Sequence, residues 1–382
     1  MDIPLKTIIA VICGCTVLLG GPAAAQGAAK GGPPSEEWKA LLQEATSLFF
    51  QGKFDSGVVV AKQALETAER ERGPNHPSVA ASLNRLAELH RVQGQYALAE
   101  PLYKRSLAIR EGLRKPDPPG VGQALNNLAL LYLAQGRHAA AEPLFKRALA
   151  VREDALGADH LDVASTLNGL AELYWDQGKS AEAEPLFKRS LAIRDKVPAP
   201  DPSRPAMSVG QAGASVNQFV ISLNGLAAIY QAQGRYEEAG SLYKRAIALI
   251  DDSRDREHPL MARALGGLAS LRAREGDYAP AEILFKRAIE ILQDSLDRDH
   301  PRMAVALQGL ADVYSARGQS AAAEALLKRA LDIRVAALGE AHPLVAATLD
   351  RLSAAYASQN RSAEARQSAE RAAASRLSAQ RK

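Results

Sequence analysis

A spacing of 42 residues organises this chain. A Lys-Arg pair, followed by a small and an aliphatic residue, recurs six times, and its copies are separated by 42, 42, 56, 42 and 42 residues. The lysines of these pairs are Lys104, Lys146, Lys188, Lys244, Lys286 and Lys328. A fixed period of this length indicates stacked supersecondary units, so we expect an extended array instead of one globular core. Stacked arrays present long surfaces that are suited to binding.

Each repeated unit reads as two helices joined by a tight turn. Between Pro77 and Leu113, apolar residues fall at helical spacing on both sides of the sequence Gln93-Gly94-Gln95. A glycine at that point can end the first helix by adopting a positive φ. The turn glycine recurs as Gly52, Gly94, Gly136, Gly178, Gly234, Gly276 and Gly318, and Asn360 takes the eighth place. Alanines at matching positions of both helices, such as Ala87 and Ala99, predict that the two helices pack closely.

The stretch from Leu125 to Leu149 reads LNNLALLYLAQGRHAAAEPLFKRAL, and junctions such as LGEAHP at 338–343 separate the units. This pattern resembles the tetratricopeptide repeat, in its kinesin-light-chain type with 42 residues per unit. The resemblance covers about residues 36–378 as eight units, of which the six central ones match strongly. It implies an all-α fold, a right-handed superhelical solenoid of about eight helix-turn-helix units.

The ends and the middle of the chain depart from the repeat. Residues 1–25 hold an apolar run and end in Ala23-Ala24-Ala25, which is typical of a secretory signal peptide, so we expect export to a bacterial periplasm or secretion. An uncleaved anchor and a lipoprotein anchored at Cys15 are the alternatives. The predicted organisation is then a flexible linker at 26–35, units one to four at 36–196, a proline-rich insert loop at 197–213, units five to eight at 214–378 and a basic tail at 379–382. The mature chain contains no predicted membrane span.

The insert accounts for the one irregular step of 56 residues. Four prolines lie in it, so it is predicted to form a loop between the second helix of unit four and the first helix of unit five. Two interpretations remain open. It is either a surface loop without a role in binding, or a flap or hinge between two blocks of four units.

Charge and motifs argue against nucleic-acid binding and catalysis. The formal net charge is only +4, and each lysine of the Lys-Arg series, apart from Lys244, has a glutamate four residues before it, which predicts a solvated outer face. Both cysteines lie in the leader, so the mature chain would hold no disulfide or cysteine metal site. No catalytic motif is present, and we expect neither an enzyme nor a cofactor.

Histidines at successive unit junctions could be mistaken for a ligand set. Stacked helix pairs should separate neighbouring junctions by about 10 Å, whereas metal–nitrogen bonds are near 2 Å, so no metal site is expected. Most of these histidines precede a proline that would open a helix, and we expect them at helix-capping positions. The residues are His76, His160, His258, His300 and His342.

The best candidates for function come from the resemblance, which implies that the first helices line a concave groove. One position of these helices is occupied by Asn84, Asn126, Asn168 and Asn224, whose amides could bond to the main chain of a peptide. The same register adds Arg91, Trp175, Asp176, Gln231, Arg263 and Arg274 to the predicted groove. The asparagines could equally form a polar helix face without a ligand.

These features predict a non-catalytic exported scaffold that binds a peptide or a partner protein in its groove. The alternative is a structural component of a cell-envelope complex that associates with itself. In that case the ends of the array, with Trp38 and the C-terminal basic helix, would control assembly.

Overall fold

A computed structural model describes residues 34–196, 209–252, 258–295 and 301–380. Within these ranges the secondary structure consists of helices without strands. The helices are α1 (Glu36–Phe50), α2 (Phe54–Arg72), α3 (Pro77–Val92), α4 (Tyr96–Glu111), α5 (Pro118–Ala134), α6 (His138–Leu156), α7 (Leu161–Asp176), α8 (Ser180–Asp195), α9 (Val209–Ala232), α10 (Tyr236–Asp252), α11 (Pro259–Arg274), α12 (Tyr278–Ser295), α13 (Pro301–Ala316), α14 (Ser320–Leu338), α15 (Pro343–Ser358) and α16 (Ser362–Gln380).

Consecutive helices pair into eight units, from unit 1 (α1 and α2) to unit 8 (α15 and α16). The predicted turn glycines all adopt the left-handed conformation, with φ between 69° and 82°, and Asn360 takes its place in unit 8 with φ 60°. Residues with a Cβ rarely tolerate this conformation, and asparagine tolerates it better than most. The predicted helix-turn-helix unit is thereby confirmed.

Small side chains let the two helices of a unit approach each other closely. Ala87 of α3 and Ala99 of α4 are completely buried, and so are the equivalent alanines of units 3 to 7. Aromatic rings fill the remaining space, among them Tyr103, Phe145 and Phe187, which are also fully buried. Apolar burial is the main force that stabilises such an array, because each unit covers the exposed face of its neighbour.

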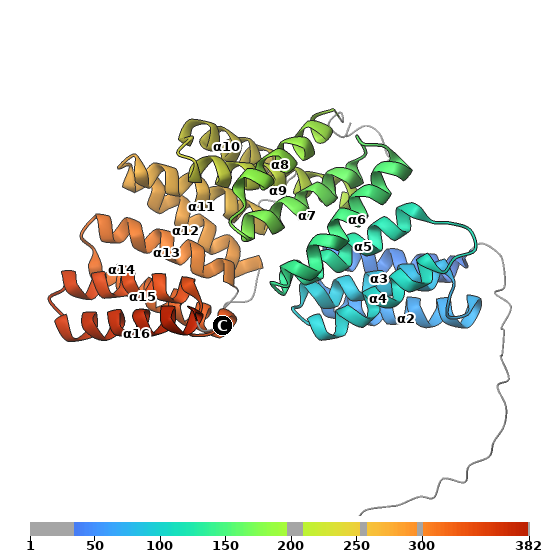
Figure 1. Cartoon of the computed structure of the whole chain (residues 1–382), viewed down its shortest axis with the longest axis horizontal. Coiled ribbons are helices and arrows are strands. Elements are labelled where there is room, and N and C mark those ends of the chain that lie inside the picture. Colours follow the sequence, from blue (N-terminus) through green and yellow to red (C-terminus); the bar gives the residue numbers. More distant parts are fainter. Residues whose placement is uncertain (1–33, 197–208, 253–257, 296–300, 381–382) are drawn as a thin grey trace, which may run out of the picture.

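The stack of units curves. From α1 to α13, the first helix of each unit contacts the first helix of the next, whereas the second helices make no comparable contacts with one another among the described residues. The first helices therefore form the inner, concave row of a right-handed superhelix. In Figure 1 the units run along an arch, and the blue-to-teal and orange-to-red limbs face each other across the concave side.

Two predicted boundaries require correction. Helix α9 begins at Val209, so the last five residues assigned to the 197–213 insert are helical, and α16 continues to Gln380, two residues into the assigned tail. In both segments the helix extends past the residues that belong to the repeat. Such an extension needs no packing partner, because the hydrogen bonds of a helix lie within the helix itself. The predicted signal peptide at 1–25 and residues 197–208 of the predicted insert lie outside the described residues.

The histidines at the unit junctions cap helices, as predicted. In each described case the ring Nδ1 accepts a hydrogen bond of 3.1 to 3.2 Å from the backbone N–H two residues later. This bond satisfies one of the donors that a helix start leaves unpaired. The residues are His76, His160, His258 and His342, while His300 lies outside the described residues.

Candidate binding surface on the concave face

The four predicted groove asparagines are buried between first helices. Their exposed fractions are 7% for Asn84, 6% for Asn126, 2% for Asn168 and 0% for Asn224. The prediction that they offer amides to a ligand is therefore wrong for this structure. The position faces the next first helix, because the superhelix brings successive first helices into contact there.

Three of the four asparagine amides, those of Asn84, Asn168 and Asn224, bond to the next unit, whereas that of Asn126 bonds only to Asn127 of its own helix. Asn168 of α7 donates to the backbone carbonyl of Gln218 at 2.9 Å and accepts from the hydroxyl of Ser222 at 2.7 Å, both on α9. Asn224 in turn donates to the carbonyl of Leu260 on α11 at 3.2 Å. A buried amide without such partners would be costly, so this position contributes to stacking.

Charged side chains of three first helices converge on the centre of the concave face. The guanidinium Nη1 of Arg263 on α11 lies 3.1 Å from the carboxylate Oε1 of Glu172 on α7, across the intervening helix α9. Both side chains are partly exposed, at 31% and 28%. Arg302 of α13 is close enough for both groups to influence its pKa.

The electrostatics of this cluster reflect its concave surroundings. The carboxylate of Asp176 is exposed, yet burial by the surrounding protein raises its pKa, and the nearby charge of Glu172 adds to that effect. Burial likewise raises the pKa of Asp312 on α13. These shifts indicate that neighbouring protein reduces the hydration of the two carboxylates.

Two further predicted residues near the centre, Trp175 and Gln231, contact the interior of the solenoid. Trp175 is partly buried against the core cluster that includes Phe187 and Tyr230. Gln231 accepts a hydrogen bond of 3.2 Å from the hydroxyl of Tyr243, whose pKa burial raises to about 12. Of the predicted residues, Asp176 and Arg263 thus come together with Glu172 and Arg302, while Trp175, next to Asp176 on α7, packs against the core. Repeat register alone could have found Glu172, which lies one turn before Asp176.

Toward the N-terminal end the concave face carries a second, smaller group. Arg85 pairs with Glu88 at 2.7 Å and lies over the ring of Phe49, 5.2 Å from its centroid. Burial raises the pKa of Tyr103, whose hydroxyl has no hydrogen-bond partner among the described residues, and the charge of Arg91 opposes that shift. Arg91 therefore lies near a buried, unpaired hydroxyl.

Arg274 lies apart from this concave cluster. Its guanidinium covers the ring of Tyr236, 4.6 Å from the centroid, at the turn end of unit 5. Its predicted role in the groove is not supported by this position.

A sequence model of the tetratricopeptide repeat matches residues 39–112, 120–196, 218–294, 268–334 and 302–378. The chain belongs to the tetratricopeptide-repeat family. No curated protein matches the sequence.

Solved structures share the repeat fold at low sequence identity. A Rap protein complexed with competence and sporulation factor is 14% identical, with 91% of this chain and 99% of that chain covered and a TM-score of 0.55. The apo form of the quorum sensor NprR from B. thuringiensis is 13% identical, with 89% and 99% covered and a TM-score of 0.54. A putative kinesin light chain from Podosopora anserina is 23% identical, with 69% and 98% covered and a TM-score of 0.33.

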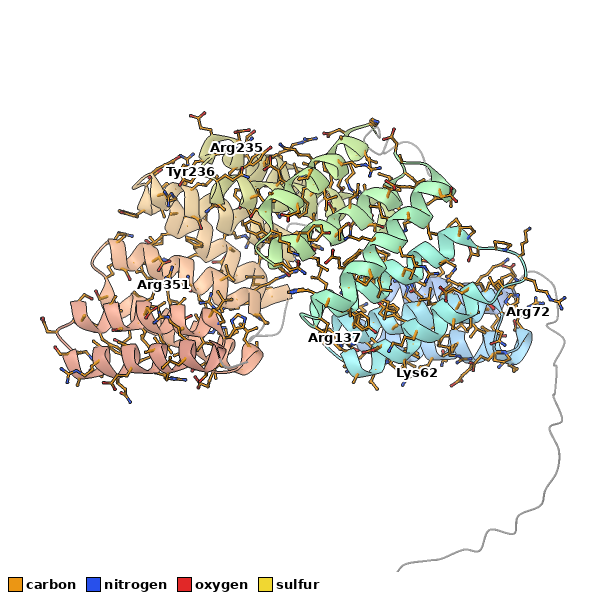
Figure 2. All side chains as sticks on the ribbon, viewed as in Figure 1. Lys62, Arg72, Arg137, Arg235, Tyr236 and Arg351 are labelled. Carbon is orange, nitrogen blue, oxygen red and sulfur yellow. The ribbon has the colours of Figure 1, made fainter. Side chains whose placement is uncertain are left out.

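The outer side of these tetratricopeptide repeats carries a recurring network, which we call the Glu hub. In the joint between units 2 and 3, Glu100 accepts from Lys104 at 2.7 Å, from the hydroxyl of Tyr132 at 3.0 Å and from Arg137 at 2.8 Å. Arg137 and Arg235, which both join such a hub, are labelled in Figure 2. The hub residues are Glu100, Glu142, Glu184, Glu282 and Glu324.

The hubs confirm the predicted pairing of glutamate with lysine on the outer face. The prediction missed the tyrosine and the basic residue that the next unit supplies, because these lie more than 30 positions away along the chain. Each hub glutamate is at most 27% exposed, so the network lies at the joint instead of in free solvent. A hub therefore ties one tetratricopeptide unit to the next.

The described residues contain no group of three or more histidine, cysteine, aspartate or glutamate side chains placed to hold a metal ion. In the same part of the chain, none of the helices has the length and apolarity needed to cross a bilayer.

Proposed function

We propose that this chain is an exported scaffold that binds a peptide or a partner protein on the concave face of its solenoid. The observation that carries this proposal is the central cluster of Glu172, Trp175, Asp176, Arg263 and Arg302, which comes from three first helices. Titratable groups with shifted pKa values that meet on one face gather at functional sites more often than elsewhere.

The chemistry of the cluster suits a polypeptide ligand. It presents carboxylates and guanidinium groups, and the partly buried Trp175 follows on the same helix as Glu172, so the surface could bind charged side chains and cover an apolar one. Tryptophan and arginine are the residue types that most often dominate binding energy at protein interfaces. The Rap structure with competence and sporulation factor shows the same fold holding a ligand, although at 14% identity it supports the fold only.

A non-catalytic role is the simplest interpretation of the titratable residues. The histidines that might have served as bases cap helices with their Nδ1 atoms. The hub glutamates accept hydrogen bonds from a lysine of their own helix and from side chains of the next unit.

Export follows from the leader at residues 1–25, and the periplasm or the exterior of a bacterium is the proposed location. Expression of the whole chain with a C-terminal tag, followed by fractionation and N-terminal sequencing, tests this point. A mature N-terminus at Gln26 in the periplasm or medium is expected. A cytoplasmic protein that retains Met1, or a lipid-modified Cys15, would contradict cleavage after Ala25.

Site-specific photocrosslinking tests where a partner binds. A photoreactive phenylalanine analogue would replace Trp175 or Asp176 on the concave face, or Glu182, which is exposed on α8, as an outer-face control. We expect the same polypeptide to be crosslinked from both concave positions and not from Glu182. Crosslinking from Glu182 alone, or equally from all three positions, would contradict binding on the concave face.

Self-association is the second candidate, and it is favoured by apolar side chains at the ends of the array. Phe50 and Val59 of unit 1 are 44% and 56% exposed, and Leu344 and Leu377 of unit 8 are 46% and 57% exposed. Light scattering at increasing protein concentration would distinguish the candidates. A mass that rises with concentration, and falls back in the Leu377→Lys variant, would support end-to-end assembly.

A further inference from the structure

The joint between units 5 and 6 lacks a Glu hub. Between units 5 and 6, the hub glutamate is replaced by Gly240, the tyrosine by Arg272 and the basic residue by Asp277. Lys244 keeps its place in the repeat but has no ion pair among the described residues, and Arg272 pairs within its own helix with Glu275 at 2.8 Å. Five other joints carry a complete glutamate–lysine pair with contacts from the next unit.

The joint between units 1 and 2 also has no hub, but apolar packing replaces it there. Val58 occupies the glutamate position and packs against a cluster that contains Leu86 and Leu89. At the joint between units 5 and 6, the position of Gly240 has no side chain, and a Cβ built there would lie 3.6 Å from Leu271, an ordinary contact distance. The joint between units 5 and 6 is thus the one where the polar network is lost without a side chain in its place.

The opposite side of the same region carries the ion pair of Glu172 and Arg263. It joins unit 4 to unit 6 and spans unit 5 on the concave face. The other ion pairs between described residues join side chains of one unit or of adjacent units. A contact that spans a unit restricts the angle of both joints it crosses.

We propose that the joint between units 5 and 6 is a hinge, and that the Glu172–Arg263 ion pair is a latch that holds the two arms of the solenoid closed. The arms are units 1 to 5 and units 6 to 8. Where a hub is present, it ties the second helix of one unit to the next unit and limits rotation. At this joint, the latch replaces that restraint from the concave side.

The latch places regulation within the surface proposed to bind a ligand. Its two side chains belong to the central cluster, so a polypeptide that reaches Arg263 or Glu172 competes with the ion pair. This role in regulating access rests on the proposed function, but the hinge and the latch do not require a ligand and are testable without one. The predicted hinge at residues 197–213 would lie one joint earlier, where Glu184 forms a hub with Lys188 and Arg235.

Distances between spin labels test the proposal on the mature chain. Cysteines are absent after Cys15, so labels on Glu182→Cys of α8 and Ala325→Cys of α14, two exposed positions, report on the two arms alone. The Glu172→Gln variant is expected to give a longer mean distance and a broader distribution than the parent. Adding Gly240→Glu, Arg272→Tyr and Asp277→Arg to that variant, which rebuilds the hub, is expected to restore the narrow distribution.

Two controls separate the hinge from a general loosening. Glu111→Gln removes an outer ion pair with Arg147 at 2.6 Å and should leave the distances unchanged. A label pair within one arm, at Asp154→Cys and Glu182→Cys, should not respond to Glu172→Gln. An unchanged distribution in Glu172→Gln, or equal broadening in both label pairs, would overturn the proposal. Because no ligand is present, either result leaves the crosslinking test of the binding surface independent.

Discussion

Arg263 and Glu172 are 91 positions apart along the chain, yet their side chains meet at 3.1 Å across helix α9. The meeting requires three units to curve so that the first and third touch on the inner side. This contact is therefore a consequence of the curvature of the superhelix, which is a property of several stacked units and not of one unit alone. The same curvature gathers Asp176 and Arg302 around the ion pair and produces the candidate binding surface.

The glycines of the first helices differ in how much space surrounds them. A Cβ added at Gly225 of α9 would lie 2.3 Å from the ring of Phe187, whereas one added at Gly266 of α11 would lie 4.0 Å from Phe285. We expect Gly225→Ala to lower the free energy of unfolding by about 1–3 kcal/mol, because the ring must move. Gly266→Ala should raise it by up to about 1 kcal/mol through helix propensity. Urea denaturation of both variants checks the contrast, and equal effects would refute it.

The histidine caps predict a loss of stability at mildly acidic pH. Burial, followed by the charges of Arg72 and Arg334, lowers the pKa of His76 and His342, so the folded chain favours neutral rings that accept through Nδ1. The unfolded pKa is near 6.5, so this contribution is fully present above about pH 6.5 and is lost as the pH falls through the lower folded pKa.

Replacement of a cap tests this pH dependence. At pH 7.5, His342→Ala should cost about 1 kcal/mol, the usual value of an N-cap. His342→Asn should keep the cap and weaken the decline in stability between pH 7.5 and 5.5. Thermal melts across this range check the prediction, and an equally steep decline in His342→Asn would contradict it.

The Glu hubs should stabilise the joints more than ordinary surface pairs do. Glu184 is 17% exposed and accepts from Lys188 of its own helix and from Gln233 across the joint between units 4 and 5. Glu238 is 55% exposed and pairs with Arg235 within its own unit. Glu184→Gln is expected to lower the free energy of unfolding by about 1 kcal/mol, and Glu238→Gln by less. The urea denaturation midpoints of the two variants test this prediction, and equal shifts would contradict it.

The hub contribution should also depend on pH in a defined direction. The hydrogen bond from Lys188, then that from Gln233, lowers the pKa of Glu184 in the folded chain. Its stabilisation is therefore present above the unfolded pKa of about 4.3 and is lost as the pH falls through the lower folded value. The difference between the parent and Glu184→Gln should shrink below that pH, and a constant difference would contradict the assignment.

The buried asparagines should affect folding before they affect binding. Asn168→Ala leaves the hydroxyl of Ser222 without one of its partners and removes a donor to Gln218, so a cost of about 1–3 kcal/mol is expected. A double-mutant cycle with Ser222→Ala should show coupling between the two residues. If Asn168→Ala is stable and its effect on the free energy of unfolding adds to that of Ser222→Ala, the asparagine has no structural role at this joint. Its amide would then again be a candidate for contact with a ligand.

Sequence alone was sufficient for the local architecture. The positive φ of the turn glycines, the capping histidines and the alanines between paired helices depend on residues a few positions apart or on one repeated register. These signals depend on residues that are close in sequence, so they can be recognised wherever the 42-residue period repeats them. The position of Asn360 in the eighth turn was predicted on the same basis.

Only the tertiary structure decided which side chains the candidate surface exposes. The repeat register placed the asparagines in the groove, but contact between successive first helices buries them, and the amides of Asn168 and Asn224 bond to the next unit. The meeting of Glu172 with Arg263 likewise depends on the angle added at each joint, which accumulates over several units. That angle arises from packing between residues of different units, which are distant in sequence. The periodic pattern therefore determines the repeat, while the curvature determines the candidate binding surface.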